Sequence, residues 1–325
     1  LQLITATFPG YSYTTDVEGF GDWIVSSSYW TTAGLDYGVH AGSHVAKVRL
    51  TDAPTAVSGS TTVTDAQIQA YLTQKIRSGT LPEPGSVLST GTLSEPLYAI
   101  YFPADITILL PDGAGGNLQS CQGFGGYHAD YLYTSASGAS TDIAYAVLPL
   151  CGAGNPGQTE LQGLTLAASH EYVEAATDRF PYTNPGYSLT DYNSPWTFIP
   201  GEVGDLCYTE WYVENGGYAV QPVWSNSAAN TSRISGQDPC VPNAWSGAPY
   251  VNVASTPSGT KVASPGQQVS FALTAFSSAP TQDWYMVPTL AGGAPSSRCS
   301  RAPPRISCVA SGCRPTRPLT KRLAS

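Results

Sequence analysis

Residues 143–177 read IAYAVLPLCGAGNPGQTELQGLTLAASHEYVEAAT. The first eight of these residues are almost wholly apolar, which is typical of a strand buried on both faces. Thr159 stands where a helix N-cap is expected, and from Glu160 to about Thr177 the sequence is Ala-rich with apolar side chains at helical spacing. A buried strand followed by such a helix predicts a mixed α/β (α+β) fold.

Segments upstream of this stretch show the same two patterns. Thr64 and Gln67 have the spacing of a capping box and predict a helix, which Gly79 is placed to end. The run LYAIYFPADITILL at residues 97–110 predicts a buried strand, a turn that contains proline, and a second strand. We therefore expect a mixed sheet with helices packed on it.

Composition changes twice towards the C-terminal end. Near residues 246–249 the sequence becomes β-like, with VNVAST at 251–256 and VSFALTAF at 269–276, but it is too short for a β-sandwich of about 100 residues. After Gly293 the residues are mainly Arg, Ser, Pro and Cys. We expect a main domain over 1–247, a partial β-sandwich-like segment over 248–290 and a basic, disordered tail over 291–325; a shifted reading frame in the gene is the alternative origin of the tail.

Charge and composition exclude two classes of function. The chain has 23 acidic and 14 basic residues and a net charge of −9, which argues against nucleic acid as the main partner. Seven of the 14 basic residues lie after residue 297, where there are no acidic ones, so the rest of the chain is strongly acidic. No run of 18 apolar residues is present, so we expect no membrane-spanning helix.

Four of the seven cysteines lie in the main domain, where three pairings are possible. We favour Cys121 with Cys151 and Cys207 with Cys240, because each pair closes a local loop; four buried thiols are the alternative. Few lysines and many Tyr and Trp favour export and oxidation. The chain begins at Leu1, and we expect a secreted, mature protein from which the export signal has been removed.

The helical part of the opening stretch contains the pattern H-E-x-x-E. His170 and Glu174 are four residues apart, so they share a helix face and can bind one ion. Glu171 lies one residue further round and can reach water on that ion, as the base does in H-E-x-x-H metalloproteases. A charged, solvent-exposed helix turn is the alternative.

Two other segments supply candidate partners for this pattern. Downstream, Glu202 fits the role of third ligand, and Asp205 is expected to hold the second nitrogen of His170. Asp178 is expected to lie behind the ligands, because it is about 12 Å along the helix from His170.

Upstream, a glycine-rich loop leads to His128, which could be a fourth ligand, a donor that stabilises an oxyanion, or a structural histidine. His40 and His44 lie in a Gly- and Ser-rich segment that favours an ordinary turn.

The runs ASHEYVEAATD (168–178) and EVGDLC (202–207) resemble motifs of the plant EXORDIUM/phosphate-induced protein family and its bacterial secreted relatives. The resemblance covers roughly residues 16–245, and one departure is Arg179, where that family usually has proline. Because the biochemistry of the family is unsettled, the resemblance implies secretion and supports the site more than any substrate. The matching positions are Ser169, His170, Glu171, Glu174, Thr177, Asp178, Glu202, Asp205, Leu206, Cys207, Cys121 and His128.

These patterns together predict a secreted zinc metallopeptidase, a monomer that acts on protein or peptide substrates. Its fold is expected to be a metallopeptidase-like domain with a mixed sheet and an HExxE active-site helix. One zinc ion, or calcium as the alternative, would be bound by His170, Glu174 and Glu202, with Glu171 as general base and His128 assisting. A non-catalytic cell-envelope or matrix protein with a structural metal is the second hypothesis, and a carbohydrate-binding protein that uses its aromatic residues is the third.

Overall fold

The structure is a computed structural model that describes residues 1–85, 95–112, 115–185, 201–208, 210–214, 216–228 and 239–242, together with the backbone of four strands after residue 250. The chain forms two compact units. The first comprises residues 1–188, 202–225 and 240–245, and the second comprises residues 189–201, 226–239 and 246–325. The change of unit at residue 246 coincides with the shift in composition.

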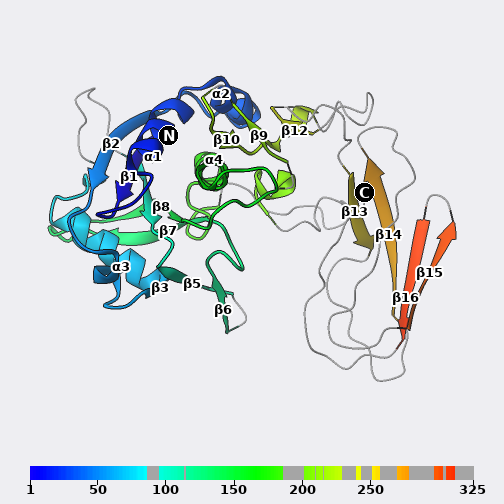
Figure 1. The fold of residues 1–325 in the computed structure, drawn as a ribbon. Coiled ribbons are helices and arrows are strands. Elements are labelled where there is room, and N and C mark those ends of the chain that lie inside the picture. The colour runs from blue at the N-terminus through cyan, green and yellow to red at the C-terminus, as the bar shows by residue number, and fades with distance from the viewer. Residues whose placement is uncertain are drawn as a thin grey trace. The chain divides into compact units, whose positions relative to one another are not determined.

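The first unit is built on a five-stranded sheet with the order β2-β1-β4-β8-β7 (Figure 1). Four of its strands are parallel, and the edge strand β7 is antiparallel to β8. The strands are β1 (Gln2–Thr7), β2 (Ser43–Arg49), β4 (Pro96–Phe102), β7 (Tyr127–Thr134) and β8 (Ser140–Pro149). A small second sheet contains β3 (Thr62–Thr64), β5 (Thr107–Pro111) and β6 (Asn117–Gln119).

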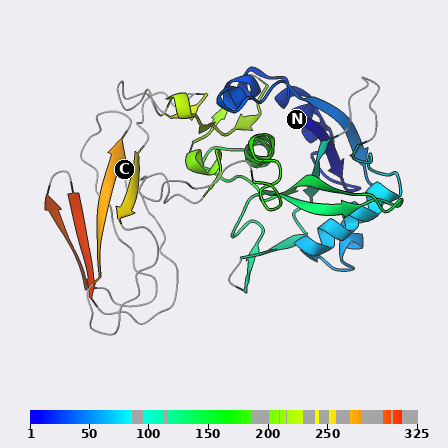
Figure 2. The same ribbon diagram turned by 180° about the vertical axis from the view of Figure 1, so that it is seen from behind.

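Helices cover both faces of the large sheet, so the unit has three layers. On one face, α1 (Thr14–Ile24), α2 (Ser28–Gly34) and α4 (Glu160–Thr177) share a core with alternate residues of β4 such as Ala99 and Tyr101. On the other face, α3 (Asp65–Arg77) packs on Ile100 and Phe102. The reverse view shows the same separation of α3 from α1, α2 and α4 (Figure 2). The mixed α/β fold predicted from the sequence is therefore confirmed.

The helix α4 begins and packs as its sequence predicts. Thr159 is its N-cap, and its hydroxyl accepts the Gln162 N–H while the Gln162 side chain accepts the Thr159 N–H. This capping box provides acceptors for backbone donors that the first turn leaves unpaired. Gly163 allows close approach, because a Cβ there would lie 2.3 Å from the carbonyl oxygen of Gly152. The buried side of α4 includes the predicted apolar residues Leu164, Ala168, Tyr172 and Ala175.

Short elements complete the first unit on both sides of the large sheet. They include η1 (Leu35–Tyr37), η2 (Pro54–Val57), η4 (Asp205–Cys207), β9 (Tyr212–Val213), β10 (Ala219–Val220), β11 (Val223–Trp224) and β12 (Cys240–Val241). The segment around β10 runs beside α4: the Ala219 N–H donates to the Thr165 hydroxyl, and the Gln221 N–H donates to the Ser169 hydroxyl. These bonds hold Gln221 beside the middle of α4.

Two disulfides tie loops of the first unit. Cys121 bonds Cys151, and Cys207 bonds Cys240, which confirms the predicted pairing. The first bridge joins the loop before β7 to the end of β8, and the second holds the end of η4.

The second unit contains an antiparallel sheet with the order β13-β14-β16-β15. Its first strands, β13 (Val251–Thr256) and β14 (Val269–Ser277), lie where the sequence predicts β-structure. The other two, β15 (Ser296–Ala302) and β16 (Arg305–Ser311), lie in the segment predicted to be disordered. This difference arises because β14 offers an edge to which the β-branched RISCVAS segment of β16 pairs.

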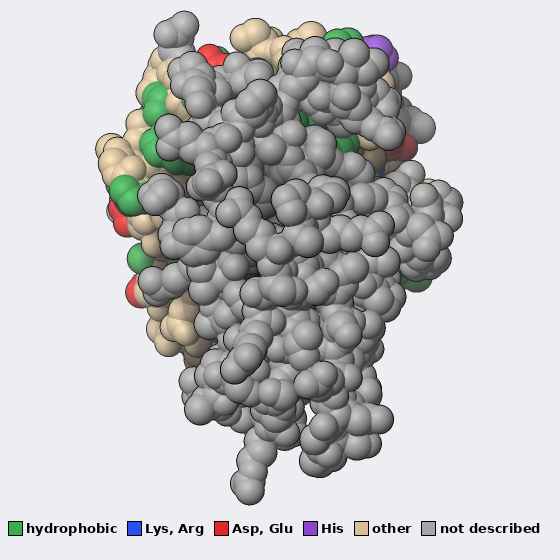
Figure 3. Space-filling view, turned by 90° about the vertical axis from the view of Figure 1, so that its right-hand side faces the viewer, with side chains coloured by type: hydrophobic (Ala, Val, Ile, Leu, Met, Phe, Trp, Pro, Cys, Tyr) green, Lys and Arg blue, Asp and Glu red, His purple; other side chains and the backbone are tan. Residues whose placement is uncertain are grey.

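Only a few acidic side chains of the first unit are visible in one space-filling view (Figure 3). In the space-filling view, the visible acidic side chains are separated by hydrophobic and other side chains (Figure 3). Such an arrangement is typical of a solvated surface. Within the residues that the structure describes, no helix has both the length and the apolar character needed to cross a membrane.

Candidate metal centre

Six ionisable side chains from three separate segments meet in the first unit. Three come from α4, one from β7 and two from the segment that leads into η4; they are His170, Glu171, Glu174, His128, Glu202 and Asp205. Exposed fractions of 7% for His128, 5% for Glu171 and 3% for Glu174 show that much of the cluster is buried. Charged groups are rarely buried together without a compensating partner.

Glu174 lies at the centre of the cluster. Its Oε2 is 3.0 Å from His170 Nε2 and 3.7 Å from His128 Nδ1. Its Oε1 accepts the backbone N–H groups of Gly204 and Asp205, at 3.0 and 3.1 Å. Burial raises the pKa of Glu174, but the two histidines and the backbone donor lower it by more, so the pKa lies below its usual value. Glu174 is therefore held as a carboxylate with Oε2 between two imidazoles.

A glutamine fixes the proton of His170. Gln221 Nε2 donates to the carbonyl oxygen of Gly204 at 2.6 Å, and this oxygen can only accept. Gln221 Oε1 must then be the atom that faces His170 Nδ1, at 3.1 Å, so Nδ1 carries the proton and donates it. The other nitrogen, Nε2, faces Glu174 Oε2 at 3.0 Å and Asp205 Oδ1 at 3.5 Å. A neutral His170 therefore points a lone pair at two carboxylate oxygens, and either a cation or a second proton must lie among the three atoms.

His128 is held in the same way by a different acceptor. Its Nε2 is 3.2 Å from the carbonyl oxygen of Asp178, so that nitrogen carries a proton. Its Nδ1 faces Glu171 Oε2 at 3.3 Å and Glu174 Oε2 at 3.7 Å. The second ring thus also directs a lone pair, when neutral, at two carboxylates.

The donor atoms form two groups that could each hold a metal ion. One is the His170 trio, which consists of His170, Glu174 and Asp205; the other is the His128 trio, which consists of His128, Glu171 and Glu174. Within each trio the donor atoms all lie within 4.8 Å of one another. Glu174 belongs to both trios.

Glu202 lies at the edge of the cluster. Its Oε2 is 3.5 Å from His128 Nε2 and has no hydrogen-bond partner among the described residues. Burial raises the pKa of Glu202 to about 8; His128 opposes this increase, while Glu174 and other carboxylates add to it. This side chain is near the other predicted ligands, but it belongs to neither trio.

The residue that holds the second nitrogen of His170 is Gln221 and not Asp205, which the sequence predicts there. Asp205 was expected at the second nitrogen of His170, but it lies near Nε2, and Gln221 occupies the place at Nδ1. Sequence reasoning missed Gln221, because a single glutamine 51 residues after His170 carries no motif. No local sequence pattern places Gln221 beside His170. Its position follows from the packing of the β10 segment against α4.

The remaining histidines and the Asp178 side chain belong to neither trio, and His44 lies on β2 and not in the ordinary turn that the sequence favours. Asp178 contributes its carbonyl oxygen to His128. His44 bonds Asp22 and Thr5 at the start of the sheet, and His40 is exposed.

Charge and close packing at the cluster both favour a bound cation. Burial alone would lower the pKa of the two histidines, but the neighbouring carboxylates raise the pKa of His128 to about 9 and that of His170 well above its ordinary value. Gly204 packs closely against the cluster, because a Cβ at this position would lie 2.8 Å from both Glu174 Oε1 and His170 Nδ1. The donor set, its excess negative charge and this tight backbone fit a small divalent cation.

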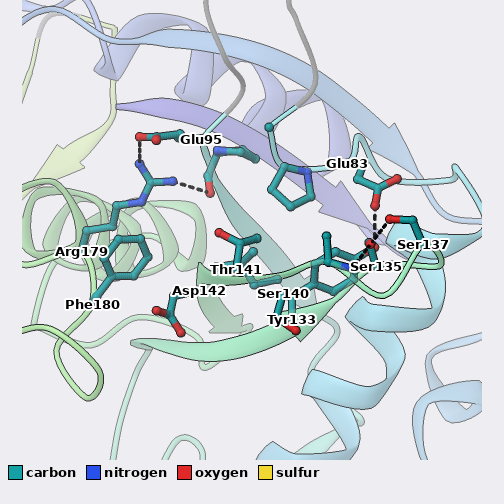
Figure 4. Close-up of a pocket in the computed structure, with 15 residues that line it drawn as sticks. Glu83, Glu95, Tyr133, Ser135, Ser137, Ser140, Thr141, Asp142, Arg179 and Phe180 are labelled. Carbon is teal, nitrogen blue, oxygen red and sulfur yellow. Dashed lines mark hydrogen bonds and ion pairs between the residues drawn. The ribbon is translucent and has the colours of Figure 1, made fainter.

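A separate pocket of about 490 Å³ lies near the β7–β8 hairpin (Figure 4). It is lined by Arg179, which bonds Glu95, and by side chains such as Tyr133 and Asp142. None of the six cluster residues lines it. The pocket is therefore distinct from the candidate metal centre.

No protein-family model, no curated protein and no solved structure matches this chain. Its function is therefore inferred from the donor atoms of the cluster.

Proposed function

We propose that the chain is a secreted, zinc-dependent metallopeptidase, with the ion at the His170 trio. The observation that carries this proposal is the fixed tautomer of His170. Because Gln221 Oε1 accepts a hydrogen bond from the Nδ1–H of His170, the lone pair lies on Nε2 and faces the oxygens of Glu174 and Asp205. One imidazole nitrogen and two carboxylate oxygens converge in this way, and zinc accepts both kinds of ligand.

The donor types favour zinc over calcium. Calcium prefers six to eight oxygen ligands, whereas the His170 trio offers an imidazole nitrogen and two carboxylates. Three protein ligands with an open fourth position are typical of catalytic zinc sites. Access also favours catalysis, since the Asp205 side chain is 45% exposed. Water and substrate can therefore reach this side of the cluster.

In this mechanism Glu171 is the general base and His128 positions it. The bound ion would supply a Lewis acid and lower the pKa of its water to about 7. Glu171 would act as the general base that accepts a proton from water. In its protonated form His128 would orient Glu171, because its Nδ1–H can then donate to Glu171 Oε2 at 3.3 Å while its Nε2 is fixed on the Asp178 carbonyl. The pair is buried, and burial strengthens the electrostatic coupling between the two groups.

The edge strand beside the cluster supports a peptide as the substrate. His128 lies on β7, and among the described strands β7 pairs only with β8. An unpaired strand edge can bind an extended peptide through backbone hydrogen bonds. A peptide bound in this way would pass close to the cluster.

A structural metal site in a non-catalytic secreted protein is the second candidate. Burial of the His128 trio favours it, because closed sites are typical of structural ions. The two disulfides fit secretion under either proposal.

The test compares metal content with peptide cleavage. The purified protein is stripped with a chelator, reloaded with zinc and assayed on casein and on a peptide library, beside the variants His170→Gln and His40→Gln. His40 is exposed and lies outside the cluster, so His40→Gln is the matched control. The peptidase proposal expects zinc-dependent cleavage in the wild type and the control, and in His170→Gln a loss of cleavage together with the zinc ion bound at the His170 trio. Zinc without cleavage would favour the structural alternative, and a protein that binds no metal would overturn both.

A further inference from the structure

We propose that the cluster has a second, inhibitory cation site at the His128 trio, bridged by Glu174 Oε2 to the ion at the His170 trio. This inference rests on the proposed function, because the inhibition acts through the general base. The ligand is a second divalent cation of the zinc class, which accepts one imidazole nitrogen and two carboxylate oxygens.

One ion cannot use all the donors of the cluster. Zinc bonds to nitrogen and oxygen are about 2.0–2.2 Å long, so two ligands of one ion lie at most about 4.4 Å apart. Among the described residues, donor atoms within 4.8 Å of one another form two trios and not one larger group. The donors of His128 and Glu171 therefore belong to a position of their own.

Geometry prepares His128 as a ligand of that second position. The Asp178 carbonyl accepts the Nε2 proton, so Nδ1 is the nitrogen left to face Glu171 Oε2 and Glu174 Oε2. This is the same relation that Gln221 imposes on His170. Both rings thus aim a lone pair towards Glu174 Oε2, which makes that oxygen the natural bridge between two ions.

The surroundings of the second position are buried and rich in carboxyl groups. All three of its side chains are buried. Glu202 adds another carboxyl group beside the His128 ring, and its Oε2 has no hydrogen-bond partner among the described residues. A buried oxygen without a partner is costly, and a cation nearby reduces that cost.

A cation at this position would inhibit the enzyme. The oxygen of Glu171 that faces His128 Nδ1 is a donor to the second ion, and coordination to a cation withdraws charge from the carboxylate, so Glu171 becomes a weaker base towards water. Cleavage should therefore rise as the first equivalent of zinc binds and fall as the second binds.

The test counts bound ions in four proteins. Chelator-stripped wild type, His128→Gln, His170→Gln and His40→Gln are titrated with zinc by calorimetry, and metal content is measured after dialysis. We expect two ions in the wild type and in His40→Gln, and one ion in each of the other two variants. Glu174→Gln should weaken both binding events, because both trios share Glu174. Circular dichroism checks that each variant folds, and Glu171→Gln, which keeps the size of the side chain, replaces His128→Gln if the latter does not fold.

The outcomes separate the two proposals. A single ion that is lost in His170→Gln and kept in His128→Gln overturns the second site and leaves the proposed function intact. A single ion that is lost only in His128→Gln overturns both, because the His170 trio is then empty. Two ions whose second equivalent leaves cleavage unchanged overturn the inhibitory role.

Discussion

Gln221 holds His170 by its Nδ1 proton across 3.1 Å, and it cannot turn round, because its amide nitrogen donates to the Gly204 carbonyl. One side chain thus sets both the tautomer of His170 and the position of the loop that carries Asp205. A partner of this kind behind a metal ligand commonly accounts for much of the affinity for the ion.

Replacing this side chain should weaken metal binding without removing a ligand. Gln221→Met keeps the length of the side chain and removes both hydrogen bonds, so we expect zinc affinity to fall by about 10–100-fold. Gln74→Met is the matched control, because Gln74 is exposed on α3. Isothermal titration of both variants checks the prediction, which fails if their zinc affinities are equal.

Glu171 and Glu174 should differ in what they control, although both are buried on α4. Glu171→Gln cannot accept a proton but leaves the His170 trio complete, so we expect it to keep the first zinc ion and to lose cleavage by roughly 10²–10⁴-fold. Glu174→Gln should lose zinc and, because binding is coupled to folding, thermal stability in the presence of zinc. Metal analysis beside a peptide assay measures both effects. The reverse result, with zinc lost in Glu171→Gln and kept in Glu174→Gln, would exchange the two roles.

A methyl group on Gly204 should disturb the cluster by contact alone. Gly204 has ordinary helical torsions, φ −77° and ψ −42°, so alanine adds no backbone strain. Its Cβ would nevertheless lie 2.8 Å from Glu174 Oε1 and from His170 Nδ1. We expect Gly204→Ala to lower zinc affinity, while Gly125→Ala, which has no atom within 4 Å of its Cβ, should not. Equal zinc affinities in the two variants would contradict the prediction and show that the side chains of the cluster shift to accommodate the methyl group.

His44 should make stability depend on pH in the absence of metal. Its side chain is 2% exposed and bonds Asp22 and Thr5. Burial lowers its pKa below the usual 6.5, with Lys47 adding to the decrease and Asp22 opposing it. Between the folded pKa and 6.5 the unfolded chain binds more protons, so the free energy of unfolding rises with pH in this range.

The contribution of His44 is therefore complete above about pH 6.5 and is lost as the pH falls from there through the folded pKa. Urea unfolding of the metal-free protein at pH 5 and 7.5 should show a larger loss on acidification in the wild type than in His44→Gln. Parallel pH profiles for the two proteins would contradict the prediction.

The Cys207–Cys240 bridge should support both stability and the site. Its loop of 33 residues restricts the unfolded chain, so replacing both cysteines by serine should lower the free energy of unfolding by about 2–5 kcal/mol. Cys207 lies two residues after Asp205, so we also expect weaker zinc binding. Removing Cys121–Cys151, with a loop of 30 residues, is the control for the loss of stability alone. Chemical denaturation and zinc titration of both double variants separate the two effects.

Elements that are determined locally could be predicted from the sequence. The capping box at Thr64 and the N-cap at Thr159 formed as expected, because each depends on residues within one helical turn. The strands β4 and β8 followed from unbroken apolar runs, since both faces of each strand are covered.

Features that depend on distant segments could not be predicted in the same way. Glu202 and Asp205 are three positions apart in one loop, and no local pattern says which of them faces His170 Nε2. Gln221 is brought to His170 only by the packing of β10 on α4. The pairing of β16 with β14 likewise requires a neighbouring strand that the basic composition of the tail does not reveal.

The order of the donors along the chain also determines when each part of the cluster can exist. His128, Glu171 and Glu174 have all been synthesised once the ribosome has passed residue 174. Asp205 comes 31 residues later, and Gln221, which fixes the tautomer of His170, comes 47 residues later. A chain that emerges N-terminal end first therefore completes the set of His128 ligands before that of His170. During biosynthesis, the position at which an ion would block the general base is complete before the position at which an ion would activate water.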